Sequence, residues 1–117
     1  GFNRVRRMNA ALLTMGLRGV ETPAQPDEAW HVFQQYVVRT ASPAQLAEQL
    51  ARAGIDTVAP YPVPVHWLPA YAQPLHLPET ERAAAETVSL PVHPGIAGVD
   101  IRTIVRAVNQ ASATRAA

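Results

Sequence analysis

The sequence predicts an α+β domain of two layers, in which a short, three-stranded and mainly antiparallel sheet carries helices on one face. The chain has 117 residues, 48% of them hydrophobic, which is enough for one modest core. Stretches with helical spacing of apolar residues alternate with short stretches rich in β-branched residues, and no segment repeats. One domain of mixed structure is therefore expected.

Four segments are predicted to be helices, three from the spacing of their apolar residues and the third along the chain, residues 79–86, from the acidic residues of its first turn. The second of them shows the clearest boundaries, because Ser42 can cap its start, Pro43 suits its first turn and Gly54 suits its exit. The last is expected to end near Asn109, with a frayed tail over residues 110–117. The predicted helices cover residues 5–17, 43–53, 79–86 and 99–109.

Three segments have the composition of strands. Trp30 to Thr40 is the strongest, since β-branched and aromatic residues alternate there with polar ones. Ile55 to Ala59 and Thr87 to Val92 are shorter, and proline follows or closes both. Three strands of this length predict a small sheet.

A proline-rich loop lies between the second and third predicted strands. Pro60 to Tyr71 contains four prolines and three aromatic residues, Tyr61, Trp67 and Tyr71. Because proline fixes φ and removes an amide donor, the loop is expected to be stiff and to hold its rings and His66 in a nearly fixed arrangement.

Composition excludes several classes of function. The formal net charge of +1 gives no field that would gather nucleic acid, and no apolar run approaches a membrane span. We therefore expect a soluble, cytoplasmic chain with neither nucleic acid nor membrane as partner. The chain has no cysteine, and all ten basic residues are arginine, so neither a thiol nor a lysine amine is available. No metal site is predicted, because the histidines lack metal-site spacing; they are His31, His66, His76 and His93.

Several segments resemble, in order, the C-terminal part of one enzyme family. These segments are Gly1-Phe-Asn3 ahead of Asn9-Ala-Ala-Leu-Leu13, His31-Val-Phe-Gln-Gln-Tyr-Val-Val-Arg39, Ala53-Gly-Ile-Asp-Thr57, Tyr61-Pro-Val-Pro-Val-His66 with Pro69-Ala-Tyr71, and Leu77-Pro-Glu-Thr-Glu-Arg82 with Leu90-Pro-Val-His-Pro94. Together they resemble the DegT/DnrJ/EryC1/StrS aminotransferases, which are pyridoxal-phosphate sugar aminotransferases.

The resemblance implies the architecture and chemistry of a fold-type I enzyme. Its large domain carries the cofactor lysine, and its small C-terminal domain closes over the site. By this resemblance residues 1–17 match the end of the large domain, residues 18–29 form a shortened linker, and residues 30–117 form the small domain. It also implies pyridoxal 5'-phosphate for the parent family, a nucleotide-linked keto-sugar substrate, an amino-acid donor, and a homodimer or a full-length homologue as partner.

The chain departs from the family pattern in three ways. In the family, two cofactor residues lie upstream of the segment that matches Gly1-Phe-Asn3: the Schiff-base lysine and the acidic residue that pairs with the pyridine nitrogen. This chain has no lysine that could replace the Schiff-base lysine. A long helix that the family carries before the Trp30 strand is replaced here by residues 16–28, which indicates an internal deletion. The arginine expected two residues after Asn3 is Val5, so Arg4 corresponds to it only if one residue is deleted. We therefore expect a fragment that binds no cofactor and is inactive alone; the alternative is a non-catalytic module that binds a homologue or another protein.

The resemblance also assigns candidate site residues. Asn3, together with Arg4, would reach the cofactor phosphate of a partner subunit, and the alternative for Asn3 is a helix cap. His66 and Tyr61 would contact the sugar substrate, whereas lone histidines and rings beside prolines often serve packing. No residue of this chain is predicted to be catalytic. The glutamates around residues 79–86 are attributed to the helix dipole alone.

The first predicted helix carries an apolar stripe, Met8, Leu12 and Met15. With the family's additional helix missing, the rest of this short chain is not expected to cover the stripe. Self-association or binding to a larger partner is predicted on this basis.

Overall fold

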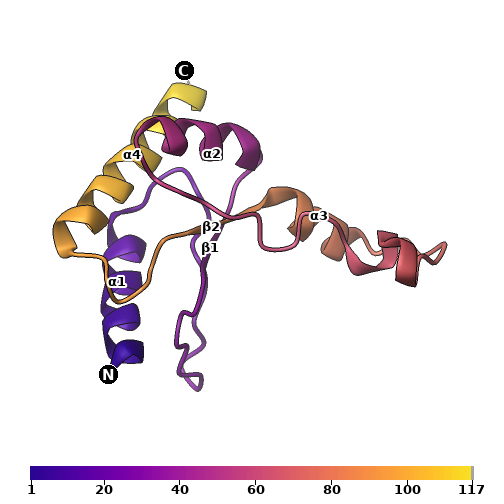
Figure 1. Cartoon of the computed structure of the whole chain (residues 1–117), viewed down its shortest axis with the longest axis horizontal. Coiled ribbons are helices and arrows are strands. Elements are labelled where there is room, and N and C mark those ends of the chain that lie inside the picture. The colour runs from indigo at the N-terminus through magenta and orange to yellow at the C-terminus, as the bar shows by residue number, and fades with distance from the viewer. Residues whose placement is uncertain (117) are drawn as a thin grey trace.

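The computed structural model describes residues 1–116, with side chains described for residues 1–113. Helices, two strands and two short 3₁₀ turns alternate along the chain (Figure 1). Within this described range no helix is long and apolar enough to cross a membrane. In chain order the elements are α1 (Phe2–Gly16), β1 (Tyr36–Arg39), α2 (Pro43–Arg52), η1 (Val65–Trp67), η2 (Pro69–Tyr71), α3 (Pro78–Glu86), β2 (Thr87–Leu90) and α4 (Gly98–Ala116).

The sheet has two strands, so the α+β class is confirmed but the expected three strands are wrong. β1 and β2 pair antiparallel, with Tyr36 opposite Leu90 and Arg39 opposite Thr87. The segment expected as a third strand, residues 55–59, contributes a single bridge between Val58 and Ser89. Pro60 has no amide donor and ends this pairing. On the other edge, Glu21 forms a single bridge with Arg39.

The predicted strand Trp30–Thr40 is shorter than expected because its first half is not extended. Phe33 has a left-handed backbone, with φ of 51°. Its amide donates to His31 Nδ1 at 2.8 Å, and the two rings stack with centroids 4.0 Å apart. A non-glycine residue in this conformation costs on the order of 1–3 kcal/mol and breaks a strand. Regular pairing therefore begins only at Tyr36.

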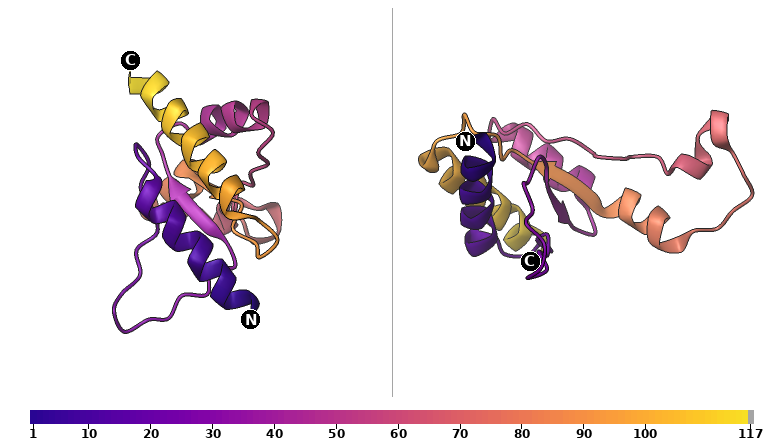
Figure 2. Two further views of the ribbon diagram at one scale, coloured as in Figure 1. Left: turned by 90° about the vertical axis from the view of Figure 1, so that its left-hand side faces the viewer. Right: turned by 90° about the horizontal axis from the view of Figure 1, so that it is seen from below.

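One face of the sheet supports the hydrophobic core. Tyr36 and Val38 of β1 lie opposite Leu90 and Val88 of β2, and all four are buried. Helices α1, α2 and α4 cover this face (Figure 2). The largest fully buried side chains in the described core are Tyr36, Leu13, Leu46, Leu50, Ile101, Val38 and Val108.

Helix α1 shares this core and packs directly on α4. Gly16 allows the approach, because a Cβ placed there would lie 2.8 Å from Val105 Cγ1. Asn109 then bonds both sides of the helix end, donating to the Gly16 carbonyl at 3.0 Å and accepting from the Arg18 amide at 2.8 Å. The buried Asn9 donates to the carbonyls after β2, with His93 O at 3.2 Å. α1 is thus an integral part of the packed domain.

Helix α4 continues beyond the expected end at residue 109, so the predicted frayed tail is wrong for residues 110–116. Ala111 is buried in the core, which extends the packed stripe of α4 by another turn. Residue 117 lies outside the described residues.

Residues 60–86 form an arm that projects from the packed helices in Figures 1 and 2. The arm consists of the proline-rich loop, η1, η2 and α3, and it rejoins the sheet at β2. No residue of α3 is buried in the core. The arm is therefore the part of the fold that presents side chains away from the domain.

Candidate functional site

An apolar cleft of about 620 Å³ lies between the proline-rich loop and α3. Its base includes Val37, which is on the face of the sheet opposite to the core. Its walls include Tyr61, Val63 and Val65 on the loop and Ala84 on α3, with Glu79 among the few polar residues. A concave apolar site with few polar groups is the usual form of a ligand pocket.

A single carboxylate holds the arm closed at its far end. Glu81 Oε2 accepts the amide of Leu77 at 2.6 Å and lies 3.2 Å from Nε2 of the buried His66. His76 Nδ1 lies 3.4 Å from the same oxygen. The backbone hydrogen bond from Leu77 lowers the pKa of Glu81, and the two histidines act in the same direction against partial desolvation. Glu81 therefore joins the loop, the start of α3 and the segment between them.

The predicted substrate residues occupy different positions in this site. Tyr61 lines the cleft and is 73% exposed, so its ring is free to stack on a ligand. His66 is buried and directs Nε2 at Glu81, which makes it a residue that fixes the arm's shape. Trp67 and Tyr71 are also largely exposed, so they do not seal the loop against the domain. Among residues 1–116 no three acidic or histidine side chains are grouped to hold a metal.

Asn3 and Arg4 lie in the first turn of α1, on the opposite side of the molecule from the arm in Figure 1. The helix cap is Gly1, and it makes no side-chain cap hydrogen bond, so the capping alternative for Asn3 is wrong. Asn3 instead accepts from Arg6 Nη1 at 3.1 Å. Both residues are exposed, and the structure does not bring them together with Tyr61 or His66.

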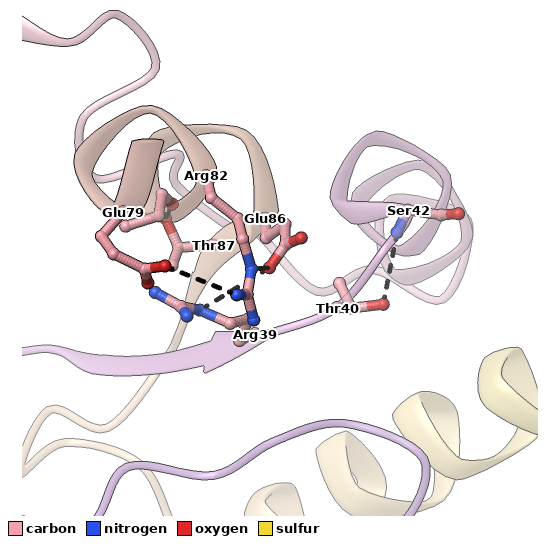
Figure 3. A network of polar contacts seen from close by, with 8 residues as sticks. Arg39, Thr40, Ser42, Glu79, Arg82, Glu86 and Thr87 are labelled. Carbon is pink, nitrogen blue, oxygen red and sulfur yellow. Dashed lines mark hydrogen bonds and ion pairs between the residues drawn. The ribbon is translucent and has the colours of Figure 1, made fainter. Parts of the chain in front are cut away.

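A second polar cluster ties α3 to the sheet (Figure 3). Glu86 lies 3.9 Å from Arg39 Nε on β1 and 3.3 Å from Arg82 Nε on α3. Arg82 also reaches Glu79 at 3.9 Å, and Thr87 donates to the Ala83 carbonyl at 2.7 Å. The cluster fixes the base of the arm, as Glu81 fixes its tip.

Glu81 is the residue of the candidate site that the sequence did not indicate. Glu81 lies in the first turn of α3, where an acidic residue is already accounted for by the helix dipole. His66 is 15 residues away in the sequence, so the sequence does not indicate a contact between the two side chains. The only local signal is its spacing from Leu77, the N-cap whose amide it accepts. Nothing in the spacing points to His66, because that contact depends on the path of the whole loop.

Comparison with known proteins decides the family. The family model described as the DegT/DnrJ/EryC1/StrS aminotransferase family matches residues 1–109. The chain belongs to this aminotransferase family. A dTDP-3-amino-3,4,6-trideoxy-alpha-D-glucose transaminase of Streptomyces venezuelae is 36% identical over 102 residues, which are 81% of this chain and 26% of the relative. A pleiotropic regulatory protein of Geobacillus stearothermophilus is 39% identical over 98 residues, 76% of this chain and 26% of the relative.

Solved structures have the same fold over nearly the whole of this chain. The aminotransferase TlmJ from Streptoalloteichus hindustanus superposes with a TM-score of 0.90 at 32% identity, over 99% of this chain and 33% of its own. DesV from S. venezuelae, in complex with a ketimine intermediate, also gives 0.90 at 32% identity, over 95% of this chain and 32% of its own. The chain thus spans about a quarter to a third of the length of its relatives.

The family is pyridoxal-phosphate-dependent, and the residues of this chain do not fit that cofactor by themselves. The cofactor is held covalently through a lysine amine, and the sequence contains none. Asn3 and Arg4 offer donors for a phosphate group, and both are exposed in the first turn of α1. A cofactor site would need residues from another part of the family fold.

Proposed function

We propose that this chain is the small domain of a pyridoxal-phosphate-dependent aminotransferase that transfers an amino group from an amino acid to a nucleotide-linked keto-sugar. The observation that carries the proposal is the superposition of nearly the whole chain on TlmJ, at a TM-score of 0.90 and 32% identity. The sugar transaminase relatives support the substrate class. A cytoplasmic location belongs to the same proposal.

In this proposal the chain is a fragment that is inactive alone. The lysine that this chain lacks would be supplied by the large domain of the family, which a full-length homologue would provide as partner. A homodimer of this chain alone would bring together two chains without lysine. Residues 1–17 would continue from the large domain, and residues 30–117 would be the closing domain. Asn3 and Arg4 would donate to the cofactor phosphate of the partner subunit.

The arm is the part of the chain that we assign to the substrate. Tyr61 is exposed at the cleft and would stack on the sugar nucleotide, while His66 would act as a positioning residue through Glu81. A ring that stacks on the ligand should affect KM, and a residue that positions the arm should affect KM and kcat together.

A domain exchange tests the proposal. In the S. venezuelae transaminase, the segment that matches this chain is replaced by this chain, and transamination of dTDP-linked keto-sugars is measured with glutamate as donor. We expect the chimera to be active and its Tyr61→Ala variant to have a KM raised about tenfold. A chimera that is folded by circular dichroism and loaded with cofactor, yet inactive on every keto-sugar tried, would refute the proposed role.

A second function, a non-catalytic interaction module, is favoured by one observation. The arm exposes Tyr61, Trp67 and Tyr71 by more than half, together with Leu75 at 49%. Exposed apolar patches of this kind mark contact surfaces. The module would bind a full-length homologue without affecting its activity. In a mixture of this chain with the S. venezuelae transaminase, the two proteins should co-elute in gel filtration and the transamination rate should stay unchanged.

A further inference from the structure

The charges of this chain are segregated between two parts of the fold. Seven of the ten arginines lie in residues 1–20 and in α4, where the only carboxylate is Asp100. Residues 21–97 contain the other three arginines and eight carboxylates. The two neighbouring helices α1 and α4 therefore carry most of the arginines of a nearly neutral protein.

Among the side chains that the structure describes, the arginines of α1 and α4 differ from the others in their partners. Arg39, Arg52 and Arg82, which lie elsewhere, each have a carboxylate within 4 Å. Among the described side chains, no arginine of α1 or α4 has one, and those of α1 that form bonds use neutral groups, such as Asn3 for Arg6. Arg7 is held by the His31 carbonyl and the Trp30 ring, whereas Arg102 and Arg106 on α4 are exposed and present their charge to a ligand.

A groove runs between α1 and α4. It has a volume of about 350 Å³ and is lined by Leu12 and Gly16 of α1 and by Ile101 and Val105 of α4, with Arg102 and Arg106 on the α4 rim. Gly16 and Gly98 keep it open, since neither carries a side chain.

On the α1 side the groove is lined by Leu12, and the apolar surface of α1 continues beyond the groove over Met8 and Met15. Leu12 is 46% exposed, and its helical neighbours Met8 and Met15 are 60% and 73% exposed. The expectation that this stripe remains uncovered by the chain is thus met in the structure. α1 spans roughly 22 Å at 1.5 Å per residue, which is the length of about four helical turns.

We propose that the α1/α4 groove binds an acidic amphipathic helix of a partner protein. The apolar face of that helix lies on Met8, Leu12 and Met15, and its carboxylates face Arg102 and Arg106. A groove between two helices fits a third helix, and the row of arginines on one rim selects an acidic one and sets its orientation. This inference concerns no step of the transamination and does not depend on the proposed function.

A second copy of this chain is a poorer fit. The acidic helix that it could offer is α3, whose Glu81 and Glu86 are already engaged by His66 and by two arginines. An anionic lipid surface is also a poorer fit, because a flat surface does not enter a concave groove between two helices. Here Leu12 lines a groove that has arginines along its other rim.

Three fluorescent peptides of about 18 residues, long enough for a helix, test the proposal. They share one leucine face and carry glutamate, glutamine or lysine on the polar face. We expect the glutamate peptide to bind at least about tenfold more tightly than the other two by anisotropy, and to weaken between about 50 and about 300 mM salt. Equal binding of the glutamate and lysine peptides would overturn the proposal.

Charge-reversal variants locate the binding. Arg102→Glu with Arg106→Glu, and separately Leu12→Glu, should each weaken the glutamate peptide about tenfold or more. Arg52→Glu on α2 is the matched control, since Arg52 is exposed and lies outside the groove, and it should leave binding unchanged. An equal loss in the control variant would contradict the assignment.

Binding of a membrane or of a second copy of the chain in the groove can be recognised with the same variants. If phosphatidylserine vesicles bind the chain more tightly than any peptide, and the double arginine variant abolishes this, a membrane surface replaces the proposed partner. If the chain alone self-associates in sedimentation and the same variant makes it monomeric, a second copy replaces it. Circular dichroism of each variant separates both results from simple unfolding.

Discussion

Replacing Gly16 by alanine should weaken the packing of α1 on α4. The new Cβ would lie 2.8 Å from Val105 Cγ1 and 3.2 Å from Cγ2, so one helix must shift. Overpacking of this kind costs about 1–3 kcal/mol, and the better helix propensity of alanine returns at most about 1 kcal/mol. We expect a net loss of about 1–2 kcal/mol in the free energy of unfolding. For a domain near this size, each kcal/mol lowers Tm by roughly 4–8 °C.

A double-mutant cycle isolates the contact. Val105→Ala alone should also destabilise, by about 1–2 kcal/mol, because it removes partly buried methyl groups. In the double variant the two alanines fit together, so the losses should fall short of additivity by about 1 kcal/mol or more. Gly98→Ala is the matched control, since a Cβ there meets nothing within 4 Å.

Urea unfolding followed by circular dichroism measures all four variants. A Gly16→Ala chain as stable as the parent, with losses that add in the double variant, would refute the close packing of the two helices. It would also indicate that α1 belongs to another domain and is not part of this packed core.

Three further predictions follow from the sheet, the arm and the missing lysine. Tyr36→Pro should unfold the domain, because Tyr36 is buried and pairs with Leu90 in the ladder. Val37→Pro should lower the free energy of unfolding less, since alternation along β1 directs the Val37 amide away from β2. Equal thermal transitions in the two variants would contradict this pairing. The lowered pKa of Glu81 means that the stabilisation of the arm is present above the ordinary pKa of 4.5 and is lost as pH falls through the lower folded value. The protection factor of the Trp67 amide, which is its exchange rate corrected for the intrinsic pH dependence, should therefore fall in acid. Glu81→Gln should remove this response and the exposed Glu79→Gln should keep it. Borohydride reduction of the chain with pyridoxal phosphate should label no side chain, and a pyridoxyl adduct found by mass spectrometry anywhere except the terminal amine would be the contrary result.

The sequence predicted the helices better than the sheet, and the reason is the range of the interactions. Helix α2 was placed within a residue because Ser42, Pro43 and Gly54 mark its ends locally. The strand at Trp30–Thr40 was overextended because composition alone does not reveal the left-handed backbone of Phe33.

The candidate site was predicted only in part for the same reason. The prolines predicted a non-helical loop at residues 60–77, since proline acts locally, but they do not decide whether Tyr61 packs or is exposed, and the structure shows it exposed. The bond between His66 and Glu81 needs the folded path of the arm, and the groove between α1 and α4 needs two helices far apart in the sequence. Neither could be predicted from spacing along the chain.

The two single bridges beside the sheet have a consequence for aggregation. A two-stranded sheet leaves two edges, and an open edge is a template for pairing with other chains. Glu21 exchanges both backbone hydrogen bonds with Arg39 at 2.9 Å, and Val58 does the same with Ser89 at 2.7 and 3.3 Å. Each edge is thus occupied at one point, by a charged residue on one side and by the segment that enters the proline-rich arm on the other. Neither edge offers an uninterrupted row of free amides and carbonyls, so this small sheet is protected against the growth of cross-β assemblies although it has only two strands.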